Sequence, residues 1–151
     1  MERPGISVLI NNYNYGRFVG QAIDSVLSQE IADVEIIVVD DGSSDESRSV
    51  LEDYDSRVKV IFQENSGQAA AINTAVKLSS GGILCFLDAD DWWAPGKLAA
   101  TVAAFRSHPE VSLVYHRLQP TSIDGSPTLK PIPRTLCSGD LSPQLTKSAG
   151  W

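Results

Sequence analysis

Runs of apolar and β-branched residues alternate along this chain with segments of helical spacing. The apolar runs, which are typical of buried strands, occupy residues 6–11, 35–40, 58–63, 83–88 and 111–115. The segments with helical spacing occupy residues 18–27, 43–51, 68–80 and 95–105. Strands that are apolar on both faces and alternate with helices predict an α/β fold, a mostly parallel sheet covered by helices on each side. The handedness of crossover connections then gives every strand the same direction.

Capping and turn residues set the expected ends of these elements. Ser43 and Glu46 have the spacing of a capping box, so we expect the second helix to open at Ser43. Gly81 and Gly82 are expected to end the third helix, and Pro95 to start the fourth.

Beyond Gln119 the pattern changes, because five prolines interrupt any regular element. The dipeptide at residues 124–125 predicts a hairpin turn, and residues 139–148 suggest a short helix. We therefore expect an α/β domain over residues 1–118 and a proline-rich hairpin and short helix over residues 119–151.

Composition narrows the possible partners and compartments. The net charge is −7, and the basic residues are scattered, which argues against nucleic acid as a partner. No basic segment followed by an apolar one opens the chain, and no apolar run is long enough to cross a bilayer. Cys85 and Cys137 form no metal-ligand pattern. A cytoplasmic location is the default expectation.

Polar residues follow four successive predicted strands. These polar sets begin at Asn11, Asp40, Glu64 and Asp88. The carboxyl ends of parallel strands meet at one edge of the sheet, where open α/β sheets bind their ligands. Turn formation and helix capping explain Ser43 and Asp45 more simply.

Five aspartates near the ends of the second and fourth strands are harder to explain as caps. They are Asp40, Asp41, Asp88, Asp90 and Asp91. Their mutual repulsion would raise their pKa values or push the loops apart unless a cation offsets it. Mg²⁺ binds one or two carboxylates and takes substrate phosphate oxygens as further ligands. Because the glycine-rich motifs for ATP and NAD are absent, we expect a diphosphate held through a divalent metal.

Taken in order, four motifs make the chain similar to the nucleotide-sugar-binding portion of the family 2 glycosyltransferases, which have the Rossmann-like GT-A fold. The motifs are SVLINNYNYGRFVGQAIDSVLSQ, EIIVVDDGSSDES, ENSGQAAAINTAV and GGILCFLDADDWWAPGKL, and the resemblance covers about the first 115 residues. It implies a nucleoside-diphosphate sugar, most simply a UDP-sugar, as donor. It also implies Mg²⁺ or Mn²⁺ as cofactor and a saccharide or other hydroxyl compound as acceptor.

The resemblance also assigns roles to residues. Tyr13 would lie against the base and Asp41 would accept a hydrogen bond from it, while Asp88 would lie towards the ribose and Asp90 on the metal. The predicted substrate-binding residues are Asn11, Tyr13, Asp40, Asp41, Asn65, Gly67, Asp88, Ala89 and Asp90. The predicted metal ligands are Asp90 and Asp88. Where many relatives have an arginine that could contact phosphate, this chain has Ile72.

The chemistry implied is inverting transfer of a glycosyl group to an acceptor hydroxyl, with a carboxylate as general base. Beyond the last predicted strand, the only side-chain carboxylates are Asp124 and Asp140, which read better as a turn residue and a helix cap, so the base is not identified. The chain is therefore expected to be truncated before an acceptor-binding half. Of the tryptophans that follow the acidic motif, Trp92 and Trp93, one could stack on a sugar and one is expected to pack in the core.

Two alternatives remain open from the sequence. One is a non-catalytic nucleotide-sugar-binding fragment, because no base is found. The other is a Mg²⁺-dependent phosphoacceptor or phosphatase-like domain, which would need a lysine at another strand end. Lys59, Lys77 and Lys97 are not placed for that role, and Arg17 could reach a phosphate or simply be solvated.

Overall fold

The computed structural model describes residues 5–54, 56–122 and 124–132. The chain divides into two compact units, Met1–Arg106 and Ser107–Trp151. The first unit contains the sheet and the helices packed on it. The functional division predicted between residues 118 and 119 stays a prediction, because a boundary set by packing does not report ligand binding.

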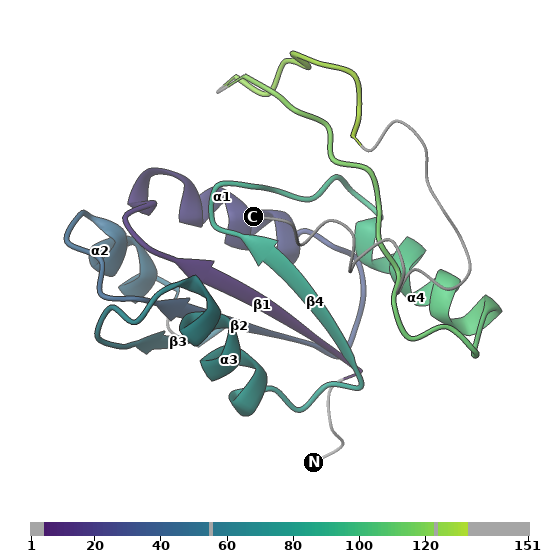
Figure 1. Cartoon of the computed structure of the whole chain (residues 1–151), viewed down its shortest axis with the longest axis horizontal. Helices are drawn as coiled ribbons and strands as arrows, with labels where there is room; N and C mark the ends of the chain where they lie inside the picture. The colour runs from purple at the N-terminus through teal and green to yellow at the C-terminus, as the bar shows by residue number, and fades with distance from the viewer. Residues whose placement is uncertain (1–4, 55, 123, 133–151) are drawn as a thin grey trace, which may run out of the picture. The chain divides into compact units, whose positions relative to one another are not determined.

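The first unit is built on a four-stranded, all-parallel sheet with the order β3-β2-β1-β4 (Figure 1). Its strands are β1 (Ile6–Asn12), β2 (Val34–Asp40), β3 (Lys59–Phe62) and β4 (Ile83–Asp88). They confirm the first four predicted strands. The strands β2 and β3 follow one another on one side of β1, whereas β4 pairs with β1 on its other side. The direction of winding therefore reverses between β1 and β4, which makes that point the expected place for a ligand.

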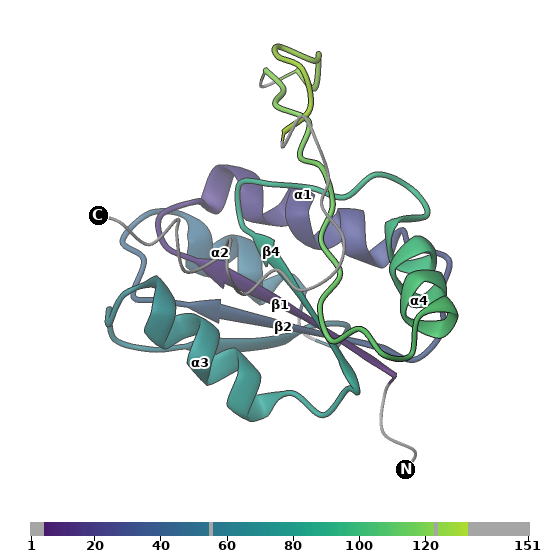
Figure 2. The ribbon, with the colours of Figure 1, turned by 45° about the vertical axis from the view of Figure 1, so that its right-hand side comes forward.

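Helices cover both faces of the sheet, as the alternating pattern predicts (Figure 2). They are α1 (Gly16–Leu27), α2 (Ser47–Glu52), α3 (Gln68–Leu78) and α4 (Lys97–Ser107). Residues of α1, α2 and α4 share one apolar core with the sheet, whereas α3 packs on the opposite face. The fold is thus the α/β arrangement expected from the sequence.

Alternate residues of the central strands supply the two cores. Val8 and Ile10 of β1 are fully buried with α1, and Leu9 between them faces α3. Burying each such side chain contributes about 1.5–3 kcal/mol relative to exposure. The contacts from α3 are the buried Ala71 and Ala75, whose small side chains let the helix lie close to the strands.

The α3 layer covers β1 and β2 but leaves the same face of β4 open. Phe86, in the middle of β4, is 55% exposed on that face, and Asp88 at its end is exposed as well. An open strip therefore leads along β4 to its carboxyl end.

The fifth predicted strand, at residues 111–115, was wrong. Within the described residues this segment forms no strand, and Leu113 is 57% exposed. The apolar pattern supplies strand propensity, but a strand forms only where a neighbour completes its hydrogen-bond ladder. No described segment pairs with residues 111–115.

The predicted hairpin in the second unit is confirmed. Antiparallel bridges join Leu118 to Ile132 and Thr121 to Pro127. Gly125 turns the chain with a φ of +83°, which a residue with a Cβ adopts only with strain. The short helix predicted at residues 139–148, with Asp140, lies outside the described residues.

Three predicted helix ends needed correction. The capping box was wrong, because α2 begins at Ser47 and the Ser43 hydroxyl instead donates to Asp40. The helix α3 ends at Leu78, before the glycines. A Cβ on Gly81 would lie 2.6 Å from the Ser7 backbone nitrogen, so that glycine allows close approach to β1 rather than ending the helix. The helix α4 begins two residues after Pro95.

Two other expectations concern apolar residues. Trp93 packs in the core at 7% exposure while Trp92 is 36% exposed, which confirms that only one of the pair is buried.

Over the ranges that the structure describes, none of the helices has the length and apolar character needed to cross a membrane.

Candidate functional site

A cleft of about 480 Å³ opens at the carboxyl ends of the strands, beside the point where the strand order reverses. It is lined by Asn11, Asn12, Tyr13, Tyr15, Asp41, Asn65, Gly67, Gln68, Ala71, Asp88, Ala89 and Asp90. A cleft of this size falls in the range of small-molecule sites. Every predicted substrate-binding residue except Asp40 lines it. The carboxylates that follow β2 and β4 therefore share one hollow.

Asp41 lies at the wall of the cleft and organises the loop that leads into α3. Its Oδ1 accepts hydrogen bonds from the Gln63 amide at 2.6 Å and from the Ser66 backbone N–H at 2.9 Å. Its Oδ2 accepts one from the Gly67 N–H at 2.7 Å. Burial raises the pKa of Asp41, but these three donors outweigh it and hold the pKa below its ordinary value. Asp41 is therefore an ionised, acceptor-only group at neutral pH.

The backbone around Asp41 depends on two glycines. Gly42 has a φ of +74°, and a Cβ there would lie 2.7 Å from the Asn65 backbone nitrogen. Gly67 has a φ of +88°, which directs its N–H towards Asp41 at the start of α3. Both conformations favour glycine, and together they let the loops after β2 and β3 pack against each other.

Asp40, the neighbour of Asp41, does not line the cleft. It is 3% exposed, and its Oδ1 accepts from the Asn12 amide at 2.7 Å and from the Ser43 hydroxyl at 2.6 Å. Its Oδ2 accepts from the Ser43 N–H at 3.1 Å. The structure therefore places Asp40 beneath the loop after β1, where it holds backbone rather than facing the hollow.

The same network fixes the aromatic rim. The Asn14 N–H donates to the Ser43 hydroxyl at 2.8 Å, and the Asn14 side chain accepts from the Ser44 N–H at 2.8 Å. These bonds hold Asn14 at a φ of +56°, between two exposed tyrosines. Tyr13 and Tyr15 are 47% and 42% exposed, and both line the cleft. Their rings offer flat apolar surface at its mouth.

The acidic motif after β4 has a different character. Asp88 and Asp90 are exposed, and buried Ala89 lies between them. Asp88 Oδ1 accepts from the Gln68 amide at 3.1 Å. For Asp90, no side-chain hydrogen bond or ion pair occurs with the described residues. The two carboxylates thus keep most of their lone pairs for a ligand.

A metal at this position would need ligands beyond the protein. In the described part of the chain, no cluster of three or more His, Cys, Asp or Glu side chains is arranged to hold an ion. Two exposed carboxylates are nevertheless a donor set that suits Mg²⁺ or Mn²⁺, which bind one or two carboxylates and complete their coordination with water and phosphate oxygens. The residues present therefore fit a metal that binds together with a phosphorylated ligand.

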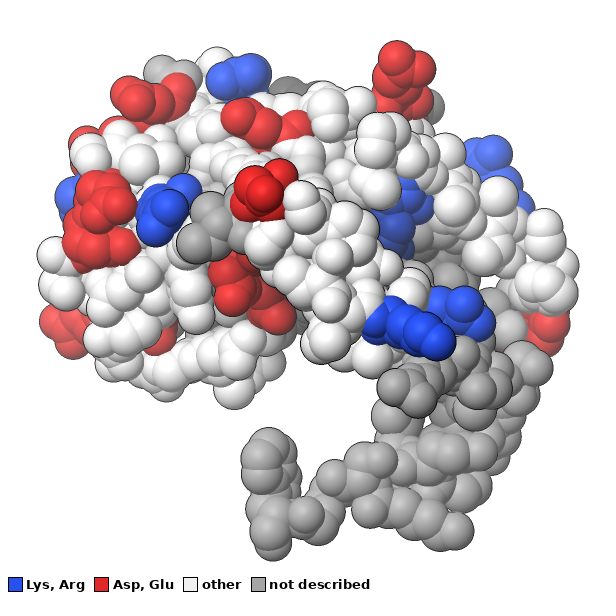
Figure 3. Space-filling model, turned by 90° about the horizontal axis from the view of Figure 1, so that it is seen from above, with Lys and Arg blue, Asp and Glu red and all other residues white. Residues whose placement is uncertain are grey.

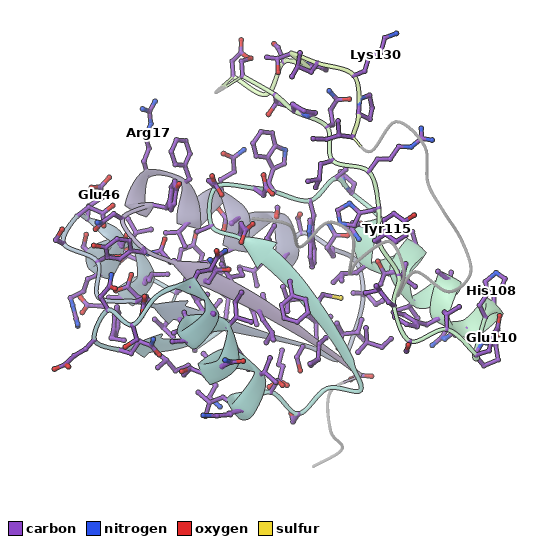
Figure 4. The ribbon with its side chains drawn as sticks, in the orientation of Figure 1. Arg17, Glu46, His108, Glu110, Tyr115 and Lys130 are labelled. Atoms are coloured by element: carbon purple, nitrogen blue, oxygen red, sulfur yellow. The ribbon has the colours of Figure 1, made fainter. Side chains whose placement is uncertain are left out.

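Positive charge is missing from the described lining of the cleft. Lys59 lies at the amino end of β3, and Lys97 packs over the Trp93 ring. Arg17 is exposed and points away from the sheet at the start of α1 (Figure 4). On the face seen in Figure 3, the described basic side chains stand in small separate groups among acidic and uncharged surface. A phosphate would thus need a cation brought from outside.

Sequence reasoning did not single out four lining residues, which are Asn12, Tyr15, Gln68 and Ala71. Gln68 could have been found as the first residue of a helix that begins at the edge carrying the polar sets. Asn12 is 1% exposed, and its Oδ1 has no hydrogen-bond partner among the described residues.

Three known proteins show how far the likeness extends. An uncharacterized glycosyltransferase of Nostoc sp. is 45% identical over 115 residues, covering 74% of this chain and 36% of its own. S. aureus TarS in complex with UDP-GlcNAc superposes with a TM-score of 0.63 and 26% identity, over 69% of this chain and 32% of its own. The mannosyltransferase PcManGT of Pyrobaculum calidifontis, in complex with GDP-Man and Mn²⁺, superposes with a TM-score of 0.60 and 27% identity, over 70% of this chain and 33% of its own.

This chain thus spans about a third of the length of each of these proteins. The sequence model described as Glycosyl transferase family 2 matches residues 7–137, which include all of the sheet except Ile6 and every residue of the cleft. The fold, the cleft at the strand ends and this match agree with the predicted resemblance, and the chain belongs to glycosyl transferase family 2.

Proposed function

We propose that this chain binds a UDP-sugar through a divalent metal and supplies the donor half of an inverting transfer to an acceptor hydroxyl. The observation that carries the proposal is the convergence of Asp41, Asp88 and Asp90 on one cleft that has no cationic side chain in its described lining. Such a cleft favours a ligand whose negative charge arrives with a metal ion.

The exposed carboxylates are assigned to the diphosphate end of the donor. Asp90 and Asp88 would hold Mg²⁺ or Mn²⁺, and Gln68 would orient Asp88 through their hydrogen bond. When bound, the metal supplies Lewis-acid stabilisation of the departing nucleoside diphosphate. Asp88, which pairs with Asn11 at the end of β1, is also assigned to the ribose hydroxyls.

The nucleoside end is assigned to the opposite part of the cleft. Tyr13 offers its exposed ring to a base, and Asp41 offers a carboxylate oxygen to an N–H group. Asn11, Asn65, Gly67 and Ala89 line the remaining wall. The lining thus combines one aromatic surface with a few polar groups, which is the usual composition of a cofactor or substrate site.

Calorimetric titration of the chain with UDP, with and without Mn²⁺, tests the assignment. We expect UDP to bind at least about tenfold more tightly when Mn²⁺ is present. If UDP bound as tightly in excess chelator as in Mn²⁺, the proposed metal dependence would be wrong. If UDP, GDP and dTDP all failed to bind under either condition, the proposed donor site would be wrong.

A second candidate is a nucleotide-sugar-binding module without catalysis of its own. It is favoured by the surroundings of Asp124, the only described carboxylate that follows the hairpin bridge at Leu118. Asp124 accepts hydrogen bonds from the Ser122 hydroxyl and the Ser126 N–H, and these hold the pKa of its carboxyl below the ordinary value. A turn carboxylate with a lowered pKa is a poor general base.

Comparing this chain with a longer protein that contains it separates the two candidates. Hydrolysis of UDP-sugar by the chain would support catalysis within these residues. Binding without hydrolysis, together with transfer by the longer protein, would support the binding module.

A further inference from the structure

We infer that Gln63, oriented by Thr74, sets the base preference of the cleft by leaving Asp41 a single open acceptor site. This inference rests on the proposed function, because it concerns the base of the same nucleotide. It assigns a specificity-determining role to two residues that do not line the cleft.

The first step is to count the acceptor sites on Asp41. An ionised carboxylate has about four lone-pair sites, two on each oxygen. On Oδ1, Gln63 and Ser66 occupy both, at 2.6 and 2.9 Å. On Oδ2, Gly67 occupies one at 2.7 Å, which leaves one open.

The second step locates the open site. The partners of Oδ1, Gln63 and Ser66, are not lining residues, whereas Gly67, the partner of Oδ2, lines the cleft together with Asp41. The saturated oxygen is therefore on the side of the loop, and the oxygen with the open lone pair is on the side of the ligand.

The third step explains why Gln63 donates with its amide nitrogen. The Thr74 hydroxyl in α3 donates to Gln63 Oε1 at 2.8 Å, so the opposite end of the amide, Nε2, points to Asp41. A reversed amide would place an oxygen against the acceptor-only carboxylate and lose that bond, so Asp41 selects the amide end that faces it while the bond to Thr74 holds the other end in place. Thr74 thus acts through Gln63 as a positioning residue.

One open acceptor site beside the ligand selects among bases by their Watson–Crick edges. The N3–H of uracil or thymine is a single donor and pairs with it. Cytosine and adenine present a ring nitrogen acceptor at the equivalent position, which would face the lone pair unpaired. Guanine presents two adjacent donors, and one of them would stay unpaired. Each unpaired buried group costs about 1–3 kcal/mol. The cleft is thus suited to a base with one imino N–H.

Calorimetry in Mn²⁺ with UDP, CDP and GDP tests this on the parent chain, Gln63→Met and the pair Thr74→Val and Thr74→Ser. We expect the parent to prefer UDP over CDP by about tenfold or more. In Gln63→Met the carboxylate keeps the Ser66 and Gly67 N–H donors but loses its third donor, so its orientation towards the base is less fixed and the preference for UDP over CDP should fall below about threefold. Thr74→Val should lower the preference for UDP over CDP by about threefold. Thr74→Ser keeps the hydroxyl and should show the same preference as the parent.

Gln21→Met, on the exposed surface of α1, is the matched control and should leave the preference unchanged. If Gln63→Met does not fold, the threonine pair carries the test. Equal weakening of UDP and CDP in the Gln63 and Thr74 variants would mean a merely structural role and overturn the inference alone. A parent without a UDP preference, or one that binds GDP more tightly, would overturn it too. A parent that binds none of the three would overturn the proposed function with it.

Discussion

The two acidic sets at the carboxyl edge of the sheet differ in what their carboxylates contact. Asp40 and Asp41, after β2, are each 3% exposed and accept hydrogen bonds from their own chain on both oxygens. Asp88 and Asp90, at the end of β4, are exposed, and the only side-chain bond that either makes with the described residues is the one from Gln68. The first pair shapes the loops of the cleft, while the second pair keeps its lone pairs for a ligand.

This difference has an energetic basis. A buried carboxylate is tolerated only when hydrogen bonds replace the water that it loses, so both oxygens of Asp40 and of Asp41 must accept hydrogen bonds in the folded chain. An exposed carboxylate keeps its water, which a metal and a diphosphate can displace. Substitutions in the first pair should therefore change stability and, at Asp41, ligand binding as well, whereas substitutions in the second pair should change ligand binding alone.

The largest expected effect is that of Asp90→Asn on metal-dependent binding. We expect the affinity for UDP in Mn²⁺ to fall about 100-fold or more, because an amide is a much weaker metal ligand than a carboxylate. The melting temperature should hardly change, since Asp90 makes no side-chain bond to the described residues. Calorimetry and thermal unfolding measure the two quantities.

The control for Asp90 is Asp53→Asn, an exposed aspartate that follows α2 and lies outside the cleft. Should Asp90→Asn bind UDP in Mn²⁺ as tightly as this control, the metal assignment of the exposed pair would be wrong.

The next effect is that of Asp41→Asn on both quantities. We expect UDP affinity to fall about tenfold while its dependence on Mn²⁺ persists, because one neutral acceptor or donor replaces the charged oxygen that faces the base. The free energy of unfolding should fall by about 1–3 kcal/mol, since an amide nitrogen would face donors such as the Gly67 N–H. Loss of the Mn²⁺ dependence in this variant would contradict the division of roles.

A smaller effect on binding is expected for Asp40→Asn. The free energy of unfolding should fall by about 1–2 kcal/mol, because the bonds from Asn12 and Ser43 lose a charged acceptor. UDP affinity should change by no more than about threefold, through the loop that carries Tyr13. Urea unfolding measures the free energy of unfolding, and calorimetry measures the affinity for UDP. A loss of metal-dependent binding as large as that of Asp90→Asn would put Asp40 in the cleft after all.

Much of this arrangement could be predicted from the sequence. The apolar runs located the strands of the sheet, and the rule that ligands bind at the carboxyl ends of strands brought Asp41 and Asp90 to one cleft. The different roles of Asp40 and Asp41 were also within reach. Successive residues of a strand point to opposite faces, so Asp41 follows Val39 towards α3, and Asp40 follows Val38 towards α1 and α2.

Other features depend on contacts that local pattern does not contain. Ser43 fits a capping box, yet its hydroxyl donates to Asp40 and accepts from the Asn14 N–H in the loop after β1. Residues 111–115 have the composition of a strand but no described neighbour to pair with. The hydrogen bonds from Thr74 to Gln63 and from Gln63 to Asp41 join α3 to the loops after β3 and β2, which only the fold brings together.

The smallest effect on ligand binding is expected for Glu35→Gln, at the amino end of the sheet, where a carboxylate also accepts several hydrogen bonds but lies far from the cleft. Glu35 accepts from the Ser7 hydroxyl at 2.5 Å and from the backbone N–H groups of Ser80 and Gly81 at 2.6 and 3.1 Å. Burial raises the pKa of Glu35, but these donors outweigh it and bring the pKa below 4.5. The resulting stabilisation is therefore full above the ordinary pKa and is lost as the pH falls through the lower value of the folded state.

Because glutamine resembles the protonated acid, Glu35→Gln should be less stable than the parent by about 1 kcal/mol at pH 7. Urea unfolding should show this difference shrinking as the pH falls below the ordinary value of 4.5. UDP affinity at pH 7 should stay within about twofold of the parent. A difference in stability that persists at low pH would assign the effect to packing instead of charge. A loss of UDP binding would show that hydrogen-bonded carboxylates influence the cleft from either end of the sheet, and the contrast between the two acidic sets would then reflect stability alone.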